Sequence, residues 1–211
     1  MNYTYNQQEI DEKVIEFIYG CAMHDAILQR AFSGEKVWVG QVKEAKIVLK
    51  KYIDKVLTNK FASQEEHDAE FLDTANAICA AINEKRPLEK ETDTFSFGNA
   101  QKLINIVVKH VYTFCYQNHD LREGFRFCHC PLDSIMLNEV WKRRDAWKEK
   151  VDIGDLDDFC KPWGSEGTVG DTQPRLDRFP LRYDIYQQAI RAIIGTGTMF
   201  PIEFDFVIWK A

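Results

Sequence analysis

Two charged residues at the starts of neighbouring apolar helices carry the clearest chemical signal in the sequence. Lys102 follows Gln101 in the first turn of a helix expected from about Asn99. The positive end of a helix lowers the pKa of a nearby amine, and a neutral amine is a nucleophile. Asp133 follows Pro131-Leu132 and precedes a second apolar run, so we expect its carboxylate to cap that helix by accepting backbone N–H bonds. The pair would combine a reactive amine with a fixed carboxylate.

The segment from Phe95 to Arg144 resembles the catalytic core of helix-hairpin-helix DNA glycosylases, in particular the archaeal 8-oxoguanine glycosylase branch. The shared features are a Gln-Lys pair that opens an apolar helix and a Pro-Leu-Asp sequence that opens the next. The resemblance implies that Lys102 attacks the sugar C1′ and forms a Schiff base. It also implies that Asp133 stabilises the oxocarbenium-like sugar and assists the amine.

The function implied by this resemblance is a DNA N-glycosylase, with β-lyase activity as an option, that removes a damaged or modified base. The sequence departs from the family before Lys102. In place of a Leu-Pro-Gly-x-Gly hairpin it has only Phe97-Gly98-Asn99. Hairpin amides supply backbone contacts to DNA phosphates, so this part of the expected DNA contact is weakened.

Five more residues are candidates for substrate binding. Phe97 and Trp141 could form the stacking wall that holds a flipped base, and Arg143 and Arg144 could contact phosphates. Gln101 completes the set. The alternative is that the aromatic residues belong to the core and the arginines to a solvated face. The organic step requires no metal and no cofactor, so neither is expected.

The sequence Cys128-His129-Cys130 raises a different possibility, a zinc-stabilised module. With Cys115 and His119 it could supply soft metal ligands. Structural zinc sites use cysteine pairs separated by two to four residues, and the sequence contains no second such pair. We therefore favour ordinary packing of this loop against the core and predict no metal site.

The adjacent residues His67 and Asp68 fall on a helix that is expected to begin after the capping-box sequence Ser63-Gln64-Glu65-Glu66. Adjacent residues on a helix do not face each other. We therefore expect the two side chains to point apart and to form no part of a catalytic triad.

Charge and composition limit the functional classes. The net charge is −6, which argues against a protein that coats nucleic acid through bulk attraction. The stretch from Asn99 to Lys150 is locally basic, which leaves room for a DNA-binding face. The acidic balance of the whole chain favours the alternative function, a non-enzymatic helical interaction or regulatory protein of a bacterium–phage system, with a protein as its partner.

The same data predict a cytoplasmic location. The sequence has no secretory signal and no apolar run of membrane-spanning length. Its 6 cysteines are therefore expected to be free thiols in a reducing compartment.

The hydrophobic periodicity predicts an all-α fold of six to eight helices in a single domain over residues 1–211, either as one body or as two lobes around a cleft between the Asn99 and Asp133 helices. From Pro201 the pattern fits either a strand or a helix, and we favour a helix because no partner strand is evident. Residues 117–131 are expected to be a loop. The remaining helices are expected at about Gln8–Phe32, Gln41–Phe61, after Ser63, Asn99–Tyr116, Asp133–Lys148 and Tyr183–Ile194.

Overall fold

The structure is a computed structural model that describes residues 13–14, 16–18, 20–21, 43–85, 95, 97–152, 181–197 and 199–209. Within these residues it contains eight helical elements and no strand, which confirms the predicted all-α fold. Most of the first predicted helix, Gln8–Phe32, lies outside the described residues. No helix in the described ranges combines the length and the apolar character that a membrane crossing requires.

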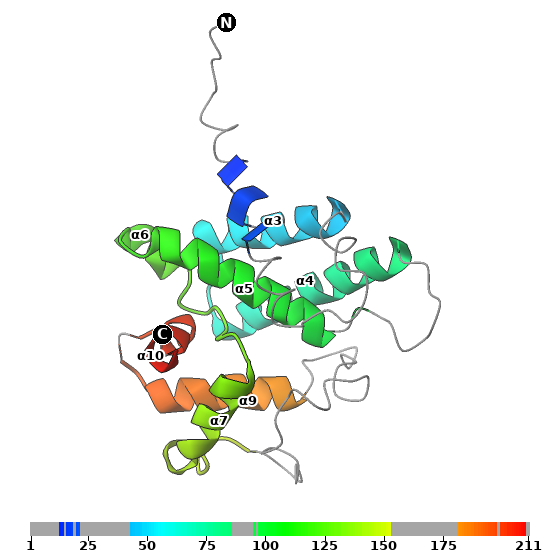
Figure 1. Cartoon of the computed structure of the whole chain (residues 1–211). Helices are drawn as coiled ribbons and strands as arrows, with labels where there is room; N and C mark the ends of the chain where they lie inside the picture. Colours follow the sequence, from blue (N-terminus) through cyan, green and yellow to red (C-terminus); the bar gives the residue numbers. More distant parts are fainter. Residues whose placement is uncertain are drawn as a thin grey trace, which may run out of the picture.

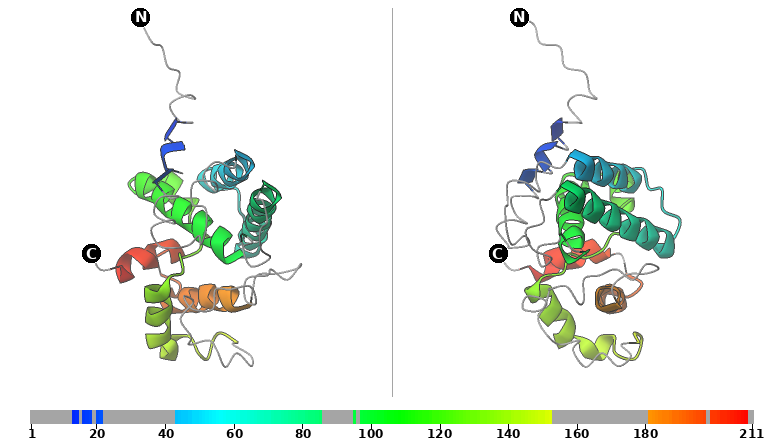
Figure 2. Two further views of the ribbon diagram at one scale, coloured as in Figure 1. Left: turned by 45° about the vertical axis from the view of Figure 1, so that its right-hand side comes forward. Right: turned by 90° about the vertical axis from the view of Figure 1, so that its right-hand side faces the viewer.

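The helices form two groups that lie one above the other (Figure 1). In the first group α3 packs on α4, α4 on α5, and α5 on the short α6. In the second group α9 contacts both α7 and α10, which also contact each other. Figure 2 shows the same separation from two further sides. The bounds are α3 Lys43–Leu57, α4 Gln64–Lys85, α5 Phe97–Cys115, α6 His119–Glu123, α7 Ser134–Lys142, the 3-10 helix η2 Arg144–Ala146, α9 Leu181–Ile194 and α10 Pro201–Ile208.

Helix α5 supplies much of the core. Leu103, Ile104, Val107, Val108 and Val111 are all buried, as the broad apolar stripe in the sequence predicted. Burying one such side chain stabilises the fold by about 1.5–3 kcal/mol. Helix α5 also contributes the buried polar residues that link the two groups, so its position decides how the candidate site is assembled.

Helix starts follow the capping signals in the sequence. Before α4, Ser63 Oγ accepts a hydrogen bond from Glu66 N at 3.2 Å, and Glu66 Oε2 accepts one from Ala62 N at 2.8 Å. Pro201 begins α10, and Glu203 Oε2 accepts from Phe200 N at 2.9 Å. Proline has no backbone N–H, and the first position of a helix needs none. The structure therefore confirms the helical interpretation of the C-terminal segment.

Helix α6 lies in the stretch that the sequence predicted to be a loop. Its cap is Asn118, whose side chain accepts from Leu121 N at 3.3 Å. After α6, a Cβ built on Gly124 would lie 2.0 Å from the carbonyl oxygen of Val56 in α3. A glycine is therefore required here for close approach to the end of α3, which holds the end of α6 against α3.

Helix α7 is shorter than predicted. It ends at Lys142, and Arg143 leaves the helical conformation with φ −98° and ψ 19°. The indole Nε1 of Trp147 donates a hydrogen bond to the carbonyl of Val140 at 2.9 Å. The same carbonyl accepts from Arg143 N at 3.1 Å, so the indole adds a second hydrogen bond to a carbonyl in the last turn of α7.

Candidate functional site

Lys102 lies on α5 with its side chain half-buried. The helix begins at Phe97, two residues earlier than predicted, so Lys102 stands in the second turn and not in the first. The field of the helix end is largely confined to the first turn, which makes it a weaker influence on this amine than expected. Burial instead lowers the pKa of Lys102, and the Asp133 carboxylate opposes this by raising the pKa.

Asp133 is the N-cap of α7, as predicted. Its backbone is extended, with φ −125° and ψ 178°, and its Oδ1 accepts a hydrogen bond from Met136 N at 2.8 Å. This bond fixes the direction of the carboxylate. Its charge acts on Lys102, so the two predicted catalytic residues, which come from different helix groups, lie within electrostatic range of each other.

A second lysine–aspartate pair lies two turns further along α5. Lys109 forms an ion pair with Asp205 of α10, whose side chain is buried. Burial raises the pKa of Asp205, the hydrogen bond and charge of Lys109 oppose this, and the charge of Asp133 adds to it. Helix α5 thus carries one lysine that is paired with a carboxylate of the second group and one that lies within electrostatic range of another.

Two of the predicted substrate-binding residues face the interior. Gln101 is fully buried, and its Nε2 donates to the carbonyl of Gly98 at 3.1 Å. Phe97 is buried and packs edge-on against Tyr183, with 5.4 Å between ring centroids. Their observed contacts are with the protein itself, so in this arrangement they would influence a substrate through their neighbours.

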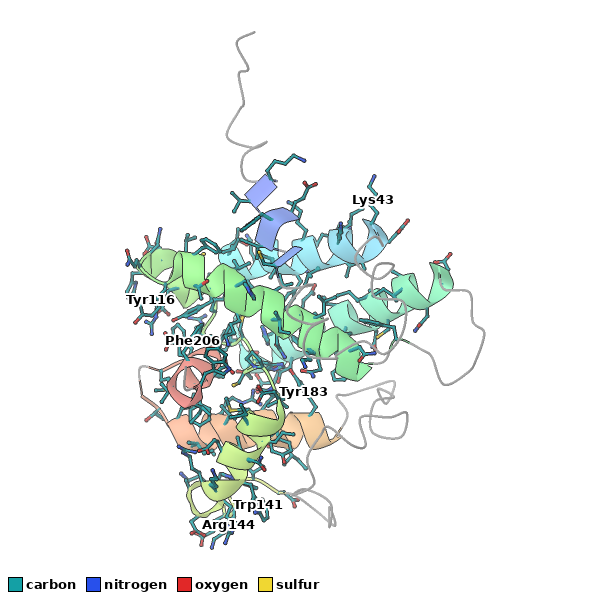
Figure 3. All side chains as sticks on the ribbon, in the orientation of Figure 1. Lys43, Tyr116, Trp141, Arg144, Tyr183 and Phe206 are labelled. Carbon is teal, nitrogen blue, oxygen red and sulfur yellow. The ribbon has the colours of Figure 1, made fainter. Side chains whose placement is uncertain are left out.

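The other three predicted residues, Trp141, Arg143 and Arg144, lie at the opposite end of α7 from Asp133. Figure 3 shows Trp141 and Arg144 at the bottom of the view. The guanidinium carbon of Arg144 lies over the Trp141 ring, 5.4 Å from the ring centroid. Arg143 forms an ion pair with Glu139. A helix of 9 residues spans about 13 Å, so these side chains are not assembled around the Lys102–Asp133 pair.

A buried polar chain, which the sequence analysis did not identify, begins on α5. Because the Gly98 carbonyl can only accept, the Gln101 atom that faces it must be the amide nitrogen. Gln101 Oε1 then accepts from Asn105 Nδ2 at 3.1 Å. The same Asn105 nitrogen contacts the Tyr183 hydroxyl at 3.0 Å, so that hydroxyl accepts from Asn105 and must donate its own proton elsewhere.

The chain continues into the loop before α7. The Tyr183 hydroxyl lies 2.9 Å from His129 Nδ1, which therefore accepts its proton. The proton of neutral His129 is then on Nε2, which donates to Asp68 Oδ1 at 2.8 Å. We call these five residues, Gln101, Asn105, Tyr183, His129 and Asp68, the buried chain. The Gly98 carbonyl fixes the direction at the start of the buried chain, and neutral His129, which must donate to the Asp68 carboxylate, fixes it at the end.

Asp68 collects several donors. Its Oδ1 lies 3.2 Å from His67 Nδ1 and accepts from Gln64 Nε2 at 2.7 Å, while His67 Nε2 lies 2.7 Å from the Tyr52 hydroxyl. Burial would raise the pKa of Asp68, but the hydrogen bonds from His129 and His67 outweigh it and hold that pKa far below its usual range. Burial lowers the pKa of His129 to about 4 and also lowers that of His67.

The prediction that His67 and Asp68 point apart is wrong. Their side chains meet, because both turn toward the loop that carries His129. With His129 they form the one group of three potential ligands in the described part of the chain, with ligand atoms within 4.8 Å of one another. A metal would need the His129 Nε2 lone pair, and the buried chain places a proton there. This proton order favours a hydrogen-bonded cluster.

The cysteines next to His129 lie inside the protein. Cys115, Cys128 and Cys130 are buried free thiols, and burial raises the pKa of each. A thiol with a raised pKa is a poor metal ligand and a poor nucleophile. The loop is packed against the core, as favoured from the sequence.

No protein-family model matches this chain, and no curated protein or solved structure matches it either. The functional argument therefore depends on the geometry of the chain itself.

Proposed function

We propose that this protein is a DNA N-glycosylase with an associated lyase step, in which Lys102 is the nucleophile and Asp133 the essential carboxylate. The observation that carries the proposal is the state of Lys102. It is a half-buried amine whose pKa is lowered by burial, within electrostatic reach of a carboxylate. A lowered pKa increases the fraction of neutral amine, which is the nucleophilic form.

The reaction can be written with these two side chains. The lone pair of the neutral Lys102 amine forms a bond from Nζ to the sugar C1′. The bond between C1′ and the base breaks, and its electron pair leaves with the base, which takes a proton from water. The new ammonium loses a proton, for which Asp133 is the acceptor. The sugar ring then opens: the nitrogen lone pair forms the C=N bond, the C1′–O4′ bond breaks, and O4′ takes the proton from Asp133, which leaves a protonated Schiff base on Lys102.

The fixed geometry of Asp133 supports its role. An N-cap carboxylate held by Met136 N keeps its direction without further rearrangement. A preorganised charge stabilises a developing positive sugar more strongly than a mobile one. The arginines and Trp141 at the far end of α7 remain proposed DNA contacts only if the duplex extends along that helix.

The test is borohydride trapping on duplex DNA that contains a damaged base. Borohydride reduces the Schiff base to a stable amine, so wild type should give a covalent adduct that Lys102→Gln abolishes. Asp133→Asn should reduce turnover by about 100-fold or more, yet keep the fold, because asparagine caps helices about as well as aspartate.

Lys142→Gln is the matched control, because Lys142 is an exposed lysine and should trap like wild type. Equal trapping by wild type and Lys102→Gln, or no DNA binding at low salt, would reject the enzyme. The alternative of a non-enzymatic interaction protein would then be the better proposal.

A further inference from the structure

The loop that ends at Asp133 is held at two successive residues by buried side chains. At the first residue, the His129 ring lies between the Tyr183 hydroxyl and Asp68 Oδ1. At the second, Gln187 Oε1 accepts from Cys130 N at 3.1 Å, and Gln187 Nε2 donates to the Cys130 carbonyl at 2.8 Å. The loop backbone is therefore paired on both its N–H and its carbonyl shortly before Asp133.

The same anchors reach the helix that carries Lys102. Tyr183 and Gln187 are one turn apart on α9 and both are buried. The Tyr183 hydroxyl also accepts from Asn105 of α5, one turn from Lys102. Figure 3 places Tyr183 between the two helix groups. One hydroxyl thus connects the helix of the amine with the loop of the carboxylate.

We propose that Tyr183, Gln187 and His129 are positioning residues, which hold the Asp133 carboxylate in register with the Lys102 amine. This inference deepens the proposed function, and its catalytic importance rests on that function. A shift of the loop would separate the Cys130 N–H and carbonyl from Gln187, at about 1–3 kcal/mol for each buried group. The loop therefore has one strongly preferred position, and catalysis is sensitive to displacements of about 1 Å.

The experiment measures the coupling between Asp133 and Lys102 without any DNA. The intact chain, labelled with 13C-lysine, is titrated by NMR, and the Lys102 signal is assigned by its loss in Lys102→Arg. In the parent, Asp133→Asn should lower the Lys102 pKa, because it removes the charge that raises it. In a Tyr183→Phe background, Asp133→Asn should change the Lys102 pKa by less than about half as much, since the carboxylate is no longer held in place.

Tyr112→Phe is the matched control. It removes a hydroxyl from another buried tyrosine, one that bonds Glu203 and Arg122 and is no part of the buried chain. In the Tyr112→Phe background, Asp133→Asn should lower the Lys102 pKa as much as it does in the parent. Tyr112→Phe and Tyr183→Phe should both reduce stability. If Tyr183→Phe does not fold, Gln187→Met takes its place, with the same expected loss of coupling.

The proposal would be overturned if Asp133→Asn changed the Lys102 pKa as much in the folded Tyr183→Phe or Gln187→Met background as in the parent. Loss of coupling in Tyr112→Phe as well would also overturn it, because it would indicate general loosening. Failure of the glycosylase is a separate result. If wild type gives no borohydride adduct, the proposed function fails, while the pKa coupling still decides whether these residues position Asp133.

Discussion

The molecule joins its two helix groups through polar contacts of two different kinds. Near Lys102 the link is the buried chain, which includes Asn105, Tyr183 and His129. Near the far end of α5 the link is ionic. There the Arg122 Nε and Nη2 atoms donate to Glu203 Oε1 at 2.8 and 2.6 Å, and the Tyr112 hydroxyl donates to the same oxygen. We call Tyr112, Arg122 and Glu203 the ionic cluster.

The two links differ in how far their side chains are exposed to water. Asn105, Tyr183 and His129 are at most 1% exposed, and only Asp68 at the end of the buried chain is 18% exposed, whereas Arg122 and Glu203 are 23% and 13% exposed. A buried neutral group must find a partner within the protein, so the buried chain has one proton order. Charged groups close to water tolerate several arrangements. The buried chain therefore fixes one arrangement of the two helix groups near Lys102. The ionic cluster holds the groups together at the other end of α5 without fixing one arrangement.

The largest expected effect is loss of the acceptor that ends the buried chain. Asp68→Ala leaves the His129, His67 and Gln64 donors without their shared oxygen, and should destabilise the fold by about 3–5 kcal/mol in urea unfolding. Asp54→Ala, which breaks an exposed pair with Lys50, is the control and should cost less than about 1 kcal/mol. Similar costs for both would remove the distinction between buried and exposed links.

Acid should weaken the buried chain next. Unfolded histidine takes up a proton below about pH 6.5, but folded His129 does so only near its pKa of about 4. Falling pH therefore favours the unfolded state across this window, by up to about 3 kcal/mol for His129 at pH 4. His67 acts in the same direction. Below about pH 4, protonation of unfolded Asp68, whose folded pKa is held lower, adds a further loss.

Urea midpoints between pH 7 and 4.5 measure this effect. They should fall steadily, and they should fall equally in Glu203→Gln, since the ionic cluster contains no histidine. A flat profile from pH 7 to 5 would show that the histidines are not held neutral.

The smallest expected effect is at the ionic cluster. Glu203→Gln removes the charge that Arg122 bonds but keeps an amide oxygen as hydrogen-bond acceptor, so it should cost only about 1–2 kcal/mol. Glu139→Gln on α7 breaks ion pairs with the less buried Lys142 and Arg143 and should cost about 0.5 kcal/mol or less. A loss at Glu203 as large as that at Asp68 would make the two links equivalent.

The sequence predicted what local patterns determine. Pro201 and Ser63 mark helix starts that the structure contains, and Asp133 caps its helix. Helix α6 was missed because its five residues, with a cap at Asn118, are too few to establish a hydrophobic period.

The buried chain was missed for a different reason. Asp68 and His129 are 61 residues apart, and Asn105 and Tyr183 are 78 apart. No local spacing marks residues that meet only after the helices pack. The cysteines beside His129 indicate either a metal ligand or ordinary packing of the loop, and neither interpretation predicts a hydrogen-bonded histidine. The sequence shows that residue 129 is a histidine, but it does not show which residues contact that histidine in the folded protein.

The buried thiols of the same loop can be used to measure how often that loop opens. Cys128 and Cys130 flank His129, and alkylation requires an exposed thiolate. Under slow alkylation their reaction rates report the free energy of opening this loop. A value equal to the global free energy of unfolding would mean that the loop before Asp133 opens only when the whole domain does. A smaller value would identify a partly open native state, in which the carboxylate separates from its amine while the helices remain folded.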